Sequence, residues 1–133
     1  MNPHERTTVA RHEVGHALDG QAVSQMLERA PKVLKLSIKP RTGGALCCTF
    51  SIPSDEDKRL TFADEIRGTL TTLLGGRAAE QVACERVSTG AIDDIQRATG
   101  LAYKSVAELG LSKAIGPINV QVCLCIVSTM ISS

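Results

Sequence analysis

Apolar and polar positions follow different periods along the chain, and these periods predict its first elements. Residues 10–21 have helical spacing, and apolar surface on this segment comes from Val9, Val14, Ala17, Leu18 and Val23. Residues 34–38 instead alternate strictly between apolar and polar side chains, and residues 46–52 alternate again. The run PRTGG at residues 40–44 predicts a turn between them. The pattern therefore indicates a helix followed by a β-hairpin that ends at Pro53.

Two more helices are predicted in the second half of the chain. The first covers residues 61–84, and its apolar stripe consists of Phe62, Ile66, Leu70, Leu73, Leu74 and Val82. We expect the adjacent glycines Gly75 and Gly76 to interrupt it. The second helix follows a candidate N-cap at residues 88–90 and runs to about Leu109. Its expected core face consists of Ile92, Ile95, Ala102, Val106 and Leu109.

The first helix carries the clearest chemical signal of the chain, because residues 12–16 read His-Glu-Val-Gly-His. On a helix, His12 and His16 lie one turn apart on the same face, where both imidazoles can bind one zinc ion. Glu13 lies at the edge of that face, where its carboxylate can reach a metal-bound water and act as general base. The alternative is an amphipathic helix that carries two partly exposed histidines. Gly15 lets another group approach the helix backbone closely, either at the metal site or at a plain crossing of two helices.

A catalytic zinc site needs a third protein ligand. His4 lies near the N-terminus, and we expect it to be solvated. Asp93 shares its helical face with polar residues and can pair with Arg97, whereas Asp94 shares its face with small and apolar residues. A carboxylate there needs a cation or strong hydrogen bonds, and zinc provides the first. Asp94 is therefore the better candidate, and an acidic residue favoured by the helix dipole is the alternative.

Composition narrows the class of protein. The chain has 133 residues, of which 43% are hydrophobic, with two Phe, one Tyr and no Trp, so we expect one small domain with an aliphatic core. The 15 Lys and Arg residues nearly balance 14 Asp and Glu residues and are dispersed, so no nucleic-acid partner is indicated. The five cysteines lack a C-x-x-C pair and predict small buried thiols in a reducing compartment. Neither a signal peptide nor an apolar run of about 18 residues occurs, so no export and no membrane span are expected.

Three motifs in order carry a family resemblance: HEVGHA at residues 12–17, LLGGRAAE at residues 73–80 and STGAIDDIQRAT at residues 88–99. Together they resemble the peptidase domain of FtsH-type ATP-dependent zinc metalloproteases, over about residues 8–117. The run at residues 40–46 looks most like the plant chloroplast branch. The resemblance implies a zinc metalloendopeptidase that acts on unfolded or flexible polypeptides. It also implies a plastid location, with the mitochondrion as the alternative.

The resemblance also implies roles for individual residues. In the family, zinc is held by the two histidines of the first motif and the aspartate of the third, which correspond to His12, His16 and Asp94 here. The glutamate of the first motif, Glu13, corresponds to the catalytic base. Glu80 matches a family glutamate near the metal, where it would orient a ligand histidine. A surface helix carboxylate is the equal alternative for Glu80.

Two departures from the family bear on function. Family members carry an AAA+ ATPase module, but this chain contains no G-x-x-x-x-G-K-[ST] motif, so it is not expected to be an ATP-driven unfoldase itself. The resemblance stops near Pro117. We therefore expect a metallopeptidase domain at residues 1–117, incomplete at its C-terminal end, and a divergent apolar tail at residues 118–133 that favours association.

The expected fold is a mainly helical α+β domain, in which three helices surround the metal and a small β-hairpin lies beside the active site. An exposed strand of that hairpin could hold an extended substrate by β-augmentation. Two other functions remain open. One is a catalytically inactive adaptor derived from a protease. The other is a zinc-stabilised interaction module that forms homo- or hetero-oligomers with full-length relatives.

Overall fold

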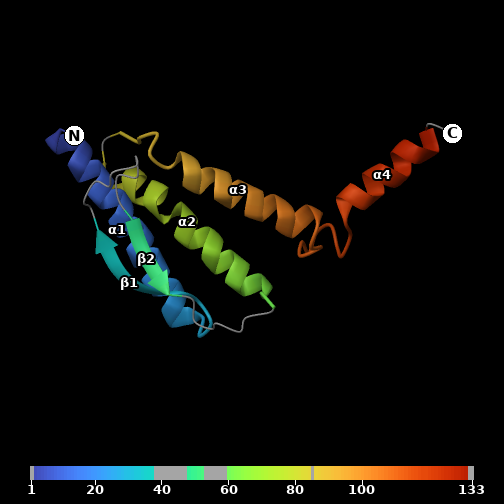
Figure 1. Ribbon diagram of the computed structural model, residues 1–133, viewed down its shortest axis with the longest axis horizontal. Helices are drawn as coiled ribbons and strands as arrows, with labels where there is room; N and C mark the ends of the chain where they lie inside the picture. The colour runs from blue at the N-terminus through green and yellow to red at the C-terminus, as the bar shows by residue number, and fades with distance from the viewer. Residues whose placement is uncertain (1, 38–47, 53–59, 85, 132–133) are drawn as a thin grey trace.

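The computed structural model describes residues 2–37, 48–52, 60–84 and 86–131. The elements in these ranges are α1 (Pro3–Met26), β1 (Lys32–Ser37), β2 (Cys48–Ile52), α2 (Ala63–Ala83), α3 (Ile92–Ala107) and α4 (Val120–Ile131). The helix α2 packs against both α1 and α3, and the strands pack against α1, while α4 extends away from this body (Figure 1). The mainly helical fold expected from the sequence is confirmed. No helix in the described ranges is both long and apolar enough to cross a membrane.

The helix α1 is longer than predicted because its start is set by capping rather than by apolar periodicity. The Asn2 side chain accepts hydrogen bonds from the backbone N–H groups of His4 and Glu5, and the Glu5 carboxylate accepts one from the Asn2 N–H. Pro3 occupies the first helical position, where its missing N–H is no loss. This reciprocal capping box adds nearly two turns ahead of residue 10. His4 is exposed, as expected.

The helix α2 is continuous, so the predicted interruption at Gly75 and Gly76 is wrong. Both glycines are buried where α2 crosses α1. A Cβ atom added at Gly15 of α1 would collide with the Gly75 carbonyl oxygen and would lie 2.6 Å from the Ala79 Cβ. Tertiary packing therefore outweighs the low helix propensity of glycine, because only glycine lets the two backbones approach this closely.

The helix α3 buries a different face from the one predicted. Its predicted core residues Ile92, Ile95, Val106 and Leu109 are exposed. The buried side chains are instead small ones: Ala98, Ser105 and Ala107, with Ala91 at the N-cap. The face that carries Asp94 is thus the inner one, since Ala98 lies one turn further along it. The helix begins at Ile92, three residues after Thr89, whose carbonyl oxygen accepts a hydrogen bond from the Ile92 N–H.

The two strands pair antiparallel, as the alternating segments predict, from Lys32 opposite Ile52 to Ser37 opposite Cys48. A shift in register lies between Val33 and Lys35. Val33 packs next to Gly20 of α1, and Leu34 is 62% exposed. The predicted turn at residues 40–44 and the predicted end at residue 53 lie outside the described residues.

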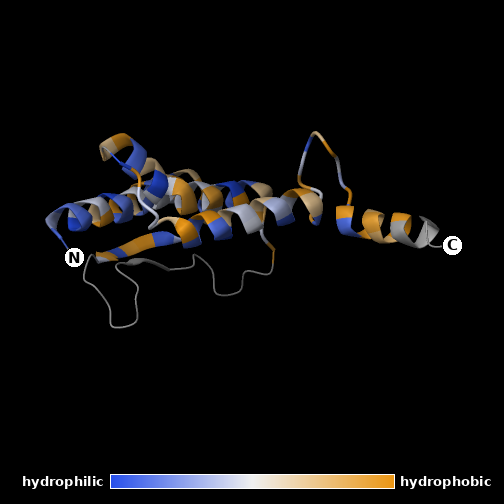
Figure 2. Ribbon diagram, turned by 90° about the horizontal axis from the view of Figure 1, so that it is seen from above, coloured by the Kyte–Doolittle hydropathy of each residue, from blue (hydrophilic) through white to orange (hydrophobic). Residues whose placement is uncertain are grey.

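The helix α4 was not predicted, and its side chains from Gln121 to Val127 are exposed. Figure 2 shows several hydrophobic positions on it, apart from the rest of the chain. Cys123 and Cys125 lie on α4 and are exposed, so the expectation of small buried thiols is wrong for these two, while Cys84 at the end of α2 is half-buried.

The helix crossing yields a direct stability prediction. We expect Gly15→Ala to lower the free energy of unfolding by about 1–3 kcal/mol, because the new methyl group forces α1 and α2 apart. Gly100→Ala is the matched control: nothing lies within 4 Å of its added Cβ, and we expect a gain of about 0.5–1 kcal/mol from helix propensity. Urea unfolding followed by circular dichroism measures both. Equal stability of the two variants would contradict the close crossing.

Candidate metal centre

The two histidines of α1 lie on its buried face, where α2 and α3 meet it. His12 is 7% exposed and His16 is 9% exposed. Their rings meet edge to face, with centroids 4.7 Å apart. The alternative of two partly exposed histidines on an amphipathic helix is therefore wrong.

The outer nitrogen of each imidazole is held by an acceptor on α2. His12 Nδ1 lies 2.7 Å from Glu80 Oε1, and His16 Nδ1 lies 2.7 Å from the carbonyl oxygen of Thr72. A carboxylate and a carbonyl can only accept, so both Nδ1 atoms carry the proton and donate it. The Nε2 atoms are then left with their lone pairs, which is the tautomer that a metal ligand requires.

These two lone pairs meet a carboxylate of α3. Asp94 Oδ2 lies 3.3 Å from His12 Nε2 and 3.2 Å from His16 Nε2, and the two Nε2 atoms are 3.0 Å apart. Three lone-pair acceptors at such distances repel one another unless a proton or a metal cation lies between them. Zinc bonds of about 2.0–2.1 Å in a tetrahedron place ligand atoms about 3.3 Å apart. The donor set and its spacing therefore fit a zinc ion.

Of the two adjacent aspartates, the structure brings Asp94 and not Asp93 to this point. Asp94 is partly buried in the first turn of α3, whereas Asp93 is exposed. His12, His16 and Asp94 form a group that could hold a metal ion, with ligand atoms within 4.8 Å of one another. The face argument made from the sequence selected the same residue.

Among the residues that the structure describes, Glu80 is the most buried large side chain, with 1% exposure, so it is not a surface carboxylate. Its Oε1 accepts hydrogen bonds from His12 and from the Ser88 hydroxyl at 3.0 Å, and its Oε2 accepts one from the Ser88 N–H at 2.6 Å. Burial alone raises the pKa of Glu80, but the hydrogen bonds from the Ser88 backbone, from His12 and from the Ser88 hydroxyl outweigh it. The net pKa lies below the usual 4.5.

Three contributors to the centre escaped the sequence analysis. Thr72 acts through its backbone oxygen, which no side-chain pattern reveals. The sequence places Ser88 in a candidate N-cap, but in the structure its backbone N–H donates a hydrogen bond to Glu80. The Ser88 carbonyl oxygen accepts a hydrogen bond from Arg77 Nη1 at 3.2 Å. Gly76 makes room for the rings, because an added Cβ would lie 2.5 Å from both Nε2 atoms. The adjacent glycines of the second motif were the feature of the sequence that could have indicated this space beside the histidines.

Glu13 and the strands complete the surroundings. Glu13 is half-buried on α1, next to His12 in the sequence. Val33 of β1 packs at Gly20, one helical turn beyond His16. The strand pair thus lies beside the metal centre, as the expected fold has it.

A buried H-E-x-x-H helix whose histidines meet an aspartate of another helix defines a site of the zinc metallopeptidase class. The sequence profile of Peptidase family M41 matches residues 1–124, so the chain belongs to this family.

Individual relatives agree with this assignment. The chain is 61% identical to "ATP-dependent zinc metalloprotease FTSH 7, chloroplastic" of Oryza sativa subsp. japonica over 121 residues, which are 90% of this chain and 15% of that protein. It is 57% identical to "ATP-dependent zinc metalloprotease FTSH 9, chloroplastic" of Arabidopsis thaliana over 117 residues, which are 87% of this chain and 14% of that protein. An FtsH of Acaryochloris marina is 48% identical, over 89% of this chain and 17% of that protein. The chain thus spans less than a fifth of these relatives' length.

The Glu80 contacts yield a prediction for the metal-free protein. We expect Glu80→Gln to lower the free energy of unfolding by about 1–3 kcal/mol, because donors approach both carboxylate oxygens and an amide offers only one acceptor oxygen. Since the folded-state pKa is lowered, this stability is present above pH 4.5 and is lost as pH falls through the folded-state pKa.

Urea unfolding at pH 7 and at successively lower pH measures this difference. Glu5→Gln is the control, because a capping box accepts glutamine at that position, and we expect a change within about 0.5 kcal/mol. A Glu80→Gln variant as stable as the parent at pH 7 would show that the amide satisfies all three donors.

Proposed function

We propose that this chain is a zinc metalloendopeptidase that hydrolyses peptide bonds in unfolded or flexible polypeptides. The observation that carries the proposal is the triangle of His12 Nε2, His16 Nε2 and Asp94 Oδ2, with sides of 3.0–3.3 Å. These three residues would hold the zinc ion, and three protein ligands leave a position open for chemistry. Membership of family M41 supports the same assignment.

The bound metal would polarise the peptide carbonyl and lower the pKa of the attacking water. Glu13 takes the proton of that water and returns it to the departing amine, as a general base and then a general acid. Its position beside His12 on α1 keeps the carboxylate near the ligands without making it one.

Glu80 and Ser88 act through His12 rather than on the substrate. The Glu80 carboxylate fixes the His12 tautomer and ring orientation, and the two Ser88 donors fix Glu80 in turn. Such partners raise the basicity of a ligand histidine and are commonly worth about 10–100-fold in metal affinity. Both are positioning residues in this proposal.

The substrate class follows from the setting of the site. An extended polypeptide can pair with the edge of the strand pair beside α1, which recognises backbone rather than side chains. The relatives are named chloroplastic. We therefore propose cleavage of flexible peptides by this chain, and a chloroplast location.

Zinc content tests the ligand assignment. We expect the parent to bind about one zinc ion per chain. His12→Ala, His16→Ala and Asp94→Ala are each expected to weaken zinc affinity by more than about 100-fold, since losing a ligand costs more than losing its orienting partner. Asp93→Ala, the adjacent exposed carboxylate, is the matched control and is expected to keep full affinity. Competition with a chromogenic chelator measures this, and an unchanged Asp94→Ala would refute the third ligand.

A second experiment separates metal binding from catalysis. We expect Glu13→Gln to retain zinc and to lose about 10²–10⁴-fold in peptide hydrolysis, because the amide cannot accept the proton. Glu28→Gln, an exposed residue just after α1, is the control and should cleave at the parent rate. The readout is turnover of an unstructured fluorogenic peptide alongside metal analysis. A zinc-loaded parent that cleaves no such peptide would favour the inactive adaptor instead.

A further inference from the structure

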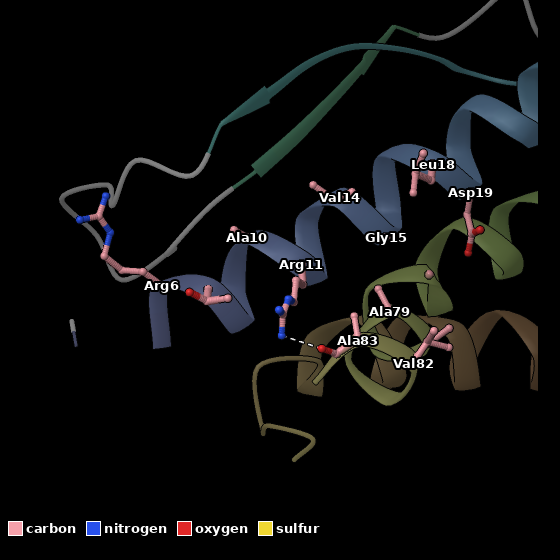
Figure 3. A pocket seen from close by; sticks show the side chains of 13 residues that line it. Arg6, Ala10, Arg11, Val14, Gly15, Leu18, Asp19, Ala79, Val82 and Ala83 are labelled. Carbon is pink, nitrogen blue, oxygen red and sulfur yellow. Dashed lines mark hydrogen bonds between the residues drawn. The ribbon is translucent and has the colours of Figure 1, made fainter. Parts of the chain in front are cut away.

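Outside the metal centre, α1 and α2 form an open groove of about 730 Å³ (Figure 3). Its floor contains the small residues Gly15 and Ala79, and its walls contain Val14, Leu18 and Val82. Leu18 is 66% exposed, and Val14 and Leu18 lie on the side of α1 turned away from the two histidines. The groove is therefore an apolar surface that the metal site does not use.

The helix α4 carries a complementary apolar surface. Residues 119–133 contain no charged side chain. Val122, Leu124, Ile126 and Val127 are all exposed, and no substantial packing of α4 on α1, α2 or α3 is found in the described ranges. A helix with this many exposed apolar side chains normally packs against another apolar surface. The described chain thus holds an apolar helix and an open apolar groove that do not meet.

Length and charge match the two surfaces. The 12 residues of α4 span about 18 Å, and the groove follows α1 from Arg6 to Asp19, about 20 Å. Asp19 lies at one end and Arg6 at the other, while Arg11 lies between them and donates to the Ala83 carbonyl oxygen (Figure 3). The positive N-terminus of a docked helix favours Asp19, and its negative C-terminus favours Arg6. The groove thus suits a helix antiparallel to α1.

The connector between α3 and α4 argues against docking within one chain. The Leu111 N–H donates to the Ser105 carbonyl oxygen, and Asn119 Nδ2 donates to the Glu108 carbonyl oxygen at 3.3 Å. Gly110 has a positive φ of 63° and contacts Pro117 closely. These contacts fold the connector upon itself and direct α4 away from the body (Figure 1). Its own α4 could reach the groove only if they broke.

We propose that α4 of a second copy of this chain docks in the α1–α2 groove, antiparallel to α1. Each copy then offers one groove and one helix, so the contact is heterologous. Two copies can close it by exchanging their α4 helices. The proposal does not depend on peptidase activity, because the groove and α4 contain none of the metal-site residues.

Single charged substitutions in the full chain test the two surfaces. Leu18→Glu and Val82→Glu place a charge in the groove, and Leu124→Glu places one on α4. We expect the parent to show at least twice the 14.1 kDa chain mass in sedimentation equilibrium, and each variant to remain at the monomer mass. Leu34→Glu is the matched control: this β1 residue is 62% exposed, and we expect its substitution to leave association unchanged. Circular dichroism and thermal melting check that each variant is folded.

Mixing distinguishes this contact from other associations. Leu18→Glu has an intact α4, and Leu124→Glu has an intact groove, so their equimolar mixture should regain a dimer that neither forms alone. Association of Leu18→Glu alone would show that α4 pairs with α4, and association of Leu124→Glu alone would show that groove pairs with groove. A mixture that stays monomeric, or a parent that is monomeric at all concentrations, would also overturn the proposal.

Discussion

The close crossing of α1 and α2 is the constraint on which the metal centre depends. Gly15 and Gly75 bring the two backbones into contact, and Gly76 leaves space for the imidazoles. The acceptors Thr72 and Glu80 on α2 then reach both Nδ1 atoms at 2.7 Å. A larger residue at any of these glycines would move α2 outward and free the rings to rotate or change tautomer. Backbone packing and histidine chemistry are thus set by the same three residues.

The centre also has a charge balance that suits a divalent cation. The centre gathers two carboxylates, Asp94 and Glu80, and two imidazoles. Ser88 donates two hydrogen bonds to Glu80, and the contacts of Asp94 found among the described residues are with the two histidine nitrogens. Such a cluster is costly without a cation and well compensated with one.

The sequence predicted which side chains come together at the site better than it predicted how the helices pack. The one-turn spacing of His12 and His16 and the inner face of Asp94 depend only on helix geometry, so both could be placed in advance. The burial of Glu80 depends on Ser88, which lies in a different segment, and no local pattern reports such a contact. The core face of α3 was predicted wrongly for a related reason. Close packing favours small residues such as Ala98, whereas a prediction from hydrophobic periodicity gives most weight to large apolar residues.

The helix α1 has the helical period that the sequence predicts, but it buries its ligand face rather than an apolar one. Its inner face carries His12, Gly15, His16 and Gly20, which are polar or lack side chains, while the apolar residues Val14 and Leu18 are exposed on the outer face. An ordinary amphipathic helix has the opposite arrangement. The metal centre requires the inversion, because the ligands must be buried and the crossing must be close. The apolar residues left outside then form one wall of the α1–α2 groove, so the same inversion that builds the metal site creates the surface on which a second chain can dock.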